Sequence, residues 1–314
     1  SSGRGESPPT DEPQRSRPYH VGMICTLTDD FDAATVERIQ ARLDEVERDH
    51  RVRVLWAVES GSRAWGFPSP DSDYDCRFFY VRRHDDYLSP WRPRDVIETP
   101  LDGVLDVNGW DLIKAVRLAA RSNATVLEWL RSPLVYRGQP AFAEELLDVC
   151  RDVVDHNAIR RHYFHAGRAH WNRSGAAEGE KVSLKKLFYA IRPAAALHWT
   201  RTLGSPVPPM NLSALLEEAP PAEDVIDAIT ALVRAKAVTR ELGEGVVPEP
   251  IRRFVLHEFG LVAKTDVPHL GPEIRERASA AFTDLLRRFA PITGTEVSAN
   301  DPDNFSAISK ISCI

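Results

Sequence analysis

Apolar and polar positions repeat with two different periods in the first third of this chain. In residues 29–49, apolar side chains recur every three or four positions, which is typical of an amphipathic helix. Residues 52–58 form a nearly continuous apolar run, and residues 74–80 are apolar at every second position. We expect both of these runs to be strands, with the helix lying on the sheet that they form.

Farther along the chain the pattern becomes helical. A short apolar run at residues 104–107 predicts one more strand. The predicted helices cover residues 110–120, 125–130, 142–154, 157–172, 183–202, 222–242 and 272–289. Linkers that contain Pro or Gly, at residues 204–209 and 243–250, separate several of them. The second half of the chain is therefore expected to be helical.

Length and composition are typical of a globular protein with a large buried core. A chain of 314 residues that is 43% hydrophobic can bury a large core, and its length suggests two domains. No apolar run approaches the roughly 20 residues that cross a bilayer, so we expect no membrane partner. The four cysteines lack metal-ligand spacing and the start of the chain does not resemble a signal peptide, which favours a cytoplasmic location.

A turn of small residues follows the first predicted strand. Gly61 and Ser62 lie in this turn, where backbone N–H groups can face an anion. Asp73 and Asp75 come at the start of the second strand, where residues two apart project from one face. Either feature alone is common, and an Asp pair on a surface strand is usually only solvated charge. Together, in this order, they indicate metal-dependent nucleotidyl transfer, with Mg²⁺ or Mn²⁺ between the carboxylates.

The chemistry demands a third acid. Two metal ions about 4 Å apart need more oxygen ligands than one Asp pair supplies. Asp106 is the candidate, because a single carboxylate in a short apolar run is costly to bury unless it is paired or metal-bound. The alternative is that Asp106 only ends a strand, since Asn108 and Gly109 follow it. We expect Asp73, Asp75 and Asp106 to be the catalytic residues and the ligands of a two-metal site.

Five segments carry a family resemblance. They are residues 59–67 (ESGSRAWGF), 72–77 (SDYDCR), 106–112 (DVNGWDL), 123–132 (NATVLEWLRS) and 185–193 (KKLFYAIRP). Together they resemble the DNA polymerase beta-like nucleotidyltransferase superfamily, and within it the RNA-repair-pathway polymerase beta family of bacterial and phage proteins. The resemblance runs from about residue 55 to the low 200s. It departs from the family at Ser122, Asn123 and Ala124, where a Gly or Pro is expected.

The resemblance implies an α+β fold. A small mixed β-sheet would carry the three acids, and an all-α domain would follow it and close over the nucleotide. We expect a disordered tail at residues 1–22, the catalytic domain at 23–140, the helical nucleotide- or substrate-binding domain at 141–292 and a weakly structured tail at 293–314. Arg63 and Ser72 lie in the matching segments, and with Gly61 and Ser62 they are expected to bind the nucleotide.

Charge is unevenly distributed along the chain. The net charge of −6 argues against indiscriminate binding along a polyanion. Between residues 160 and 201, however, nine basic residues stand against two acidic ones. Lys185, supported by Lys181 and Arg168, is the preferred triphosphate ligand, and Tyr189 lies one helical turn from Lys185, where it can border the base. The alternative is that these helices only present a solvated basic face.

The expected reaction is in-line attack on the α-phosphate of a nucleoside triphosphate, with release of pyrophosphate. The family resemblance suggests an RNA 3′ hydroxyl as the acceptor, in terminal nucleotide addition or repair. A protein side chain or a small hydroxylated molecule is the main enzymatic alternative, because one catalytic core supports both. A nucleotide-binding regulatory module without turnover is the alternative from another class.

Overall fold

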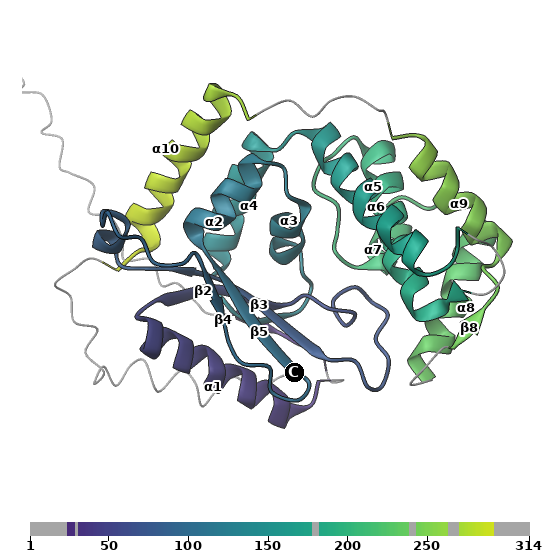
Figure 1. Ribbon diagram of the computed structural model, residues 1–314, viewed down its shortest axis with the longest axis horizontal. Helices are drawn as coiled ribbons and strands as arrows, with labels where there is room; N and C mark the ends of the chain where they lie inside the picture. The colour runs from purple at the N-terminus through teal and green to yellow at the C-terminus, as the bar shows by residue number, and fades with distance from the viewer. Residues whose placement is uncertain (1–23, 29–30, 178–181, 239–242, 263–269, 292–314) are drawn as a thin grey trace, which may run out of the picture.

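The computed structural model describes residues 24–28, 31–177, 182–238, 243–262 and 270–291 (Figure 1). At its centre is a mixed sheet with the strand order β1-β6-β2-β3-β5-β4. Strands β3 and β5 pair in parallel, and the other described pairs of this sheet are antiparallel. The strands are β1 (Ile24–Thr26), β2 (Arg53–Glu59), β3 (Tyr74–Val81), β4 (Val96–Glu98), β5 (Leu105–Asp111) and β6 (Val135–Gly138).

One face of the sheet is covered by α1 (Ala33–His50), which Figure 1 shows beneath the strands. Asp32 caps the start of the helix by accepting a hydrogen bond from the backbone N–H of Thr35, and Arg51, whose φ of 51° is left-handed, caps its end. Its apolar stripe, which includes Ile39 and Leu43, is buried against the even-numbered residues of β3. The odd-numbered residues of β3, among them Asp75, therefore face the other side.

Helices from two separate parts of the chain lie on the opposite side of the sheet. They are α2 (Leu112–Ala120), α3 (Ala124–Leu130), α4 (Pro140–Val153) and α10 (Pro272–Phe289). Phe79 of β3 packs there against Trp129, which stacks on Trp110 with 3.9 Å between ring centroids. Although α10 lies at the end of the described chain, it contacts α2 and α4 (Figure 1).

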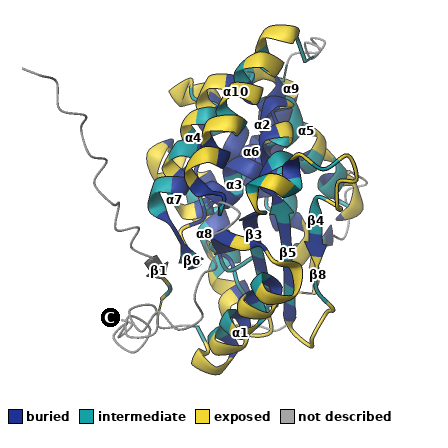
Figure 2. Cartoon of the chain, turned by 90° about the vertical axis from the view of Figure 1, so that its left-hand side faces the viewer, coloured by how far each residue is buried: buried dark blue, intermediate teal, exposed yellow. Residues whose placement is uncertain are grey.

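The remaining helices form a second body beside the sheet. They are α5 (His156–Arg173), α6 (Leu184–Leu203), α7 (Leu212–Glu218), α8 (Glu223–Val238) and α9 (Glu249–Gly260). The segment between α5 and α6 pairs with the segment between α8 and α9 through two short strands, β7 (Val182–Ser183) and β8 (Glu244–Gly245). Elsewhere, η1 (His84–Tyr87) is a 3₁₀ turn whose Tyr87 ring packs against Phe282 of α10. Figure 2 shows α6 largely buried at the centre of these helices.

A buried arginine joins the two bodies. Arg192 of α6 donates to Oε1 of Glu128 on α3 at 2.8 Å and to the backbone carbonyl of Met210 at 2.7 Å. Its guanidinium also lies 5.2 Å from the centre of the Trp65 ring, in the loop that follows β2. Both charged groups are largely withdrawn from solvent, so this contact fixes α6 against the sheet.

The predicted α+β class is confirmed, and the sheet is mixed as the resemblance implied. The sequence pattern missed β1, β4 and β6, which have only three or four residues each, and it missed α7 and α9. It also began the helix at residue 110, whereas β5 continues to Asp111, which caps α2 directly. The expected tails at residues 1–22 and 293–314 lie outside the described residues, and the domain boundary at 140/141 stays a prediction.

Candidate active site

The turn after β2 is built around Glu59. The Glu59 carboxylate is buried and accepts hydrogen bonds from the backbone N–H of Gly61 at 2.9 Å, the N–H of Asp75 at 3.2 Å and the hydroxyl of Tyr136. Burial raises the pKa of Glu59. A Cβ atom on Gly61 would lie only 2.1 Å from Oδ2 of Asp75, so a side chain at this position would collide with the carboxylate. Because Gly61 has no side chain, the backbone of the turn can lie close to the Asp75 carboxylate.

The loop between β2 and β3 is held by its own polar groups. Ser62 donates from its hydroxyl to Oγ of Ser72 at 2.9 Å, and the same Ser72 oxygen accepts the N–H of Ser69 at 2.8 Å. Arg63 donates to the Ser72 carbonyl at 2.8 Å and lies 4.1 Å from the centre of the Tyr74 ring. Ser62 and Ser72 line a cavity, whereas Arg63 is not among the residues that line it and instead holds the loop through these contacts.

Two of the predicted acids meet across the parallel strands. Asp75 of β3 is the register partner of Asp106 of β5, and Asp73 lies just before β3 begins. The guanidinium of Arg77 lies between the partners, 3.1 Å from Oδ1 of Asp75 and 2.6 Å from Oδ2 of Asp106. Burial raises the pKa of Asp75, Arg77 opposes the rise, and the Asp106 and Asp73 carboxylates add to it. The cluster therefore favours a positive charge at this point.

The donors around this point suit a hard cation. Within the described ranges, no group of three His, Cys, Asp or Glu side chains is arranged to hold a metal ion. Asn108, however, donates from Nδ2 to Oδ1 of Asp106, and its own Oδ1 is buried without a hydrogen-bond partner. Carboxylate and amide oxygens are the ligands that Mg²⁺ and Mn²⁺ accept. The chemistry of these oxygen donors therefore suits Mg²⁺ or Mn²⁺, while Arg77 occupies the space between Asp75 and Asp106.

Helices α6 and α8 form the opposite wall. The acids Asp73 and Asp75 share a cavity of about 390 Å³ with side chains from both helices. Its lining residues are Ser60, Gly61, Ser62, Trp65, Asp71, Ser72, Asp73, Asp75, Arg77, Lys185, Tyr189 and Lys236. Tyr189 packs edge-on against Trp65 with 5.3 Å between centroids. Burial raises the pKa of the Tyr189 phenol, and the nearby carboxylates of Asp75 and Asp73 raise it further.

Lys236 of α8 was missed in the sequence. Its side chain is buried, and its ammonium lies 4.6 Å from the centre of the Phe67 ring and 5.3 Å from that of Phe188. Burial lowers the pKa of Lys236 to about 8, and the positive charge of Lys185 lowers it as well. The available signal was its position seven residues after Ile229, on the buried face of the predicted helix.

The structure brings together most, but not all, of the predicted nucleotide-binding residues. Gly61, Ser62, Ser72, Lys185 and Tyr189 line the same cavity. Arg168 of α5 lines a different cavity, so its place does not favour contact with the same triphosphate. Lys181 lies outside the described residues.

Comparison with known proteins shows the family of this chain. The profile of the RNA repair pathway DNA polymerase beta family matches residues 36–288. The uncharacterized protein YcgL of Bacillus subtilis (strain 168) is 37% identical over 223 residues, which cover 71% of this chain and 85% of YcgL. None of the helices in the described ranges is both long and apolar enough to span a membrane.

Proposed function

Because this chain belongs to the RNA repair pathway DNA polymerase beta family, we propose that it is a metal-dependent nucleotidyltransferase. In this proposal it transfers a nucleoside monophosphate from a nucleoside triphosphate to an RNA 3′ hydroxyl and releases pyrophosphate. The observation that supports it best is the cavity in which Asp73 and Asp75 face Lys185 and Lys236 from two helices. Carboxylates on one wall and ammonium groups on the other suit a metal-bound triphosphate.

The metal ligands in this proposal are Asp73, Asp75 and Asp106. Bound Mg²⁺ or Mn²⁺ supplies Lewis acidity, which neutralises phosphate charge and lowers the pKa of the attacking hydroxyl. A carboxylate oxygen of Asp106 accepts the proton that this hydroxyl loses. Arg77 has to release Asp75 and Asp106 before both carboxylates are available, because it now occupies the space between them.

The other residues bind and orient the nucleotide. The Gly61 turn and the hydroxyls of Ser62 and Ser72 contact the outgoing phosphates. Lys185 and Lys236 balance the phosphate charge that the metal leaves uncovered. Tyr189, held by Trp65, borders the base.

The acceptor can be identified by a labelling experiment. The purified protein is incubated with each α-labelled nucleoside triphosphate, Mg²⁺ or Mn²⁺, and either total RNA or total protein. Label on the 3′ ends of RNA, absent with Asp73→Asn, supports the proposal. Label on protein supports a protein acceptor, and bound nucleotide without any labelled product supports a regulatory module.

A further inference from the structure

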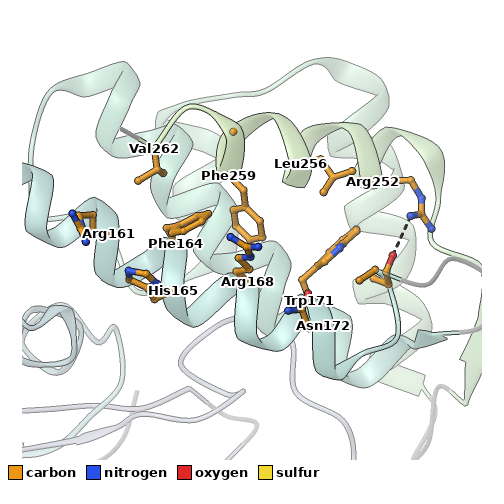
Figure 3. Close-up of a pocket in the computed structure, with 13 residues that line it drawn as sticks. Arg161, Phe164, His165, Arg168, Trp171, Asn172, Arg252, Leu256, Phe259 and Val262 are labelled. Carbon is orange, nitrogen blue, oxygen red and sulfur yellow. Dashed lines mark hydrogen bonds between the residues drawn. The ribbon is translucent and has the colours of Figure 1, made fainter. Parts of the chain in front are cut away.

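A second cavity lies between α5 and α9, away from the acids (Figure 3). Its volume is about 680 Å³, and side chains from both helices point into it. Arg161, Phe164, Arg168 and Trp171 contribute from α5, three or four residues apart, so they share one helix face. Across from them, α9 contributes Arg252 and Phe259. We call this space the α5–α9 groove.

Close packing between the helices builds the groove floor. Gly167 has no side chain, and a Cβ atom there would lie 2.7 Å from the Phe259 ring and 2.9 Å from Cβ of Pro193. This gap lets Phe259 reach α5, where it packs edge-on against Phe164 at 5.8 Å between centroids. Trp171 and Phe259 are both buried. The floor is therefore aromatic and closely packed, and its half-buried ring is that of Phe164.

The rim of the groove is positively charged. Arg168 lies 5.7 Å from the centre of the Phe164 ring, and Arg252 lies 5.9 Å from that of Trp171 while it donates to the Ala176 carbonyl at 3.1 Å. Of the described residues that line the groove, none is acidic. Three guanidinium groups over an aromatic floor, in a chain of net charge −6, form a local site for an anionic ligand with flat apolar parts. A single nucleic-acid strand has both properties.

The arrangement of the charges favours a strand over a free nucleotide. Arg161 and Arg168 lie seven residues apart on α5, which is about 10 Å along the helix axis, so they are spread along the groove. The same helix also reaches the candidate active site. The His170 ring lies 5.2 Å from that of Tyr189, which lines the acid cavity, and the next residue, Trp171, lines the groove.

We propose that the α5–α9 groove binds the single-stranded 3′ segment of the acceptor RNA, an inference that rests on the proposed function. The arginines contact successive phosphates, and the half-buried ring of Phe164 receives base surface. The groove then holds nucleotides upstream of the 3′ end, and the 3′ hydroxyl itself reaches the α-phosphate in the acid cavity.

The test measures binding without transfer. A fluorescein-labelled single-stranded RNA of 12 nucleotides is titrated with the full chain in EDTA, without nucleotide, and its anisotropy is followed at several salt concentrations. We expect the double variant R161Q/R168Q to lose affinity by about tenfold or more. The slope of log affinity against log salt should fall by about 1.4, since each lost phosphate contact on a single strand removes about 0.7. Leu256→Glu, which adds an anion to the groove at an exposed position, should also weaken binding.

The matched control is R48Q/R287Q, which removes two positive charges at exposed arginines on other helices and should leave affinity and slope nearly unchanged. Unchanged RNA affinity in both groove variants would overturn the proposal. So would displacement of the RNA by AMP at a concentration close to the RNA's own dissociation constant, which would indicate a nucleotide pocket.

Failure of the groove proposal and failure of the proposed function would give different results. RNA that binds through the groove but never acquires label would support the groove and contradict nucleotidyl transfer to RNA. Labelled RNA whose affinity is indifferent to R161Q/R168Q and Leu256→Glu would support the transfer reaction and overturn the groove.

Discussion

Asp75 on β3 and Asp106 on β5 are register partners in parallel strands, and one guanidinium bridges them. Two carboxylates that share a site repel each other unless a cation lies between them. Arg77 supplies this cation in the structure described here, at 2.6 Å from Asp106. Metal binding and the Arg77 bridge are therefore expected to compete.

Removing this competitor should strengthen metal binding. With Arg77→Met, we expect the affinity for Mn²⁺ without nucleotide to rise by about tenfold, because the carboxylates lose their resident positive charge. Titration followed by electron paramagnetic resonance measures free Mn²⁺ directly. Arg38→Met, which breaks the exposed ion pair with Asp102, serves as the control. Weaker Mn²⁺ binding in Arg77→Met would show that the guanidinium supports the site.

The acids can be tested without disturbing the fold. Asp73 is exposed and Asp106 is half-buried, so Asp73→Asn and Asp106→Asn should melt within a few degrees of the wild type. We expect transfer to fall by about a thousandfold or more, because each variant removes a metal ligand. Asp49→Asn, at an exposed site on α1, should retain full activity. Normal turnover in either test variant would remove that acid from the mechanism.

Gly61 offers a steric test of the phosphate turn. In Gly61→Ala the new methyl group would collide with the Asp75 carboxylate, so we expect about 1–3 kcal/mol of destabilisation and weaker triphosphate binding. Thermal melting and calorimetric titration measure the two effects. Gly260→Ala is the control, since nothing lies within 4 Å of its added Cβ atom. If Gly61→Ala binds triphosphate normally, the turn does not approach the phosphates.

Triphosphate binding should depend on pH through Lys236. Its pKa of about 8 leaves the ammonium charged at pH 7 and mostly neutral at pH 9. We expect wild-type affinity for the triphosphate to fall by several-fold between these values, and Lys236→Met to bind weakly with little change over this range. Titration calorimetry at each pH provides the comparison. Parallel pH curves for the two proteins would contradict a phosphate contact by Lys236.

The lowered pKa of Lys236 also makes the free energy of unfolding depend on pH, in a direction that can be predicted. Between pH 8 and about 10.5, the unfolded chain keeps the Lys236 proton that the folded chain has lost. The free energy of unfolding of the wild type should therefore rise with pH in this window, relative to that of Lys236→Met. Urea unfolding at pH 7.5 and pH 9.5 measures the difference, and a relative fall would contradict the lowered pKa.

The sequence predicts the parts of the candidate site that depend on local spacing. Three such parts are each formed by residues close together in the sequence: the Gly61 turn, the Asp73–Asp75 pair and the helical turn from Lys185 to Tyr189. Strand or helix periodicity is enough to place the side chains of each pair on one face. The positions of Arg77 and Lys236 depend on contacts between distant segments. Arg77 meets Asp106 only because β3 pairs with β5 in this register, and Lys236 meets Phe67 only because α8 packs beside α6. Helical periodicity places Lys236 on the buried face of α8, but it does not identify the partner of either side chain.

The packing of α10 bears on which parts of the fold can differ between relatives of this chain. Helices α4 and α10 contact each other on the sheet side, while α5 to α9 lie between them in the chain. The second helical body is therefore an insertion whose two ends return to one scaffold. A truncation before residue 272 would remove the helix that packs on α2 and α4, so we expect an N-terminal fragment to be less stable than the full chain. In the proposed function, a relative that serves another acceptor would keep the acids and the α6 and α8 positions of Lys185, Tyr189 and Lys236, and would change the α5–α9 groove.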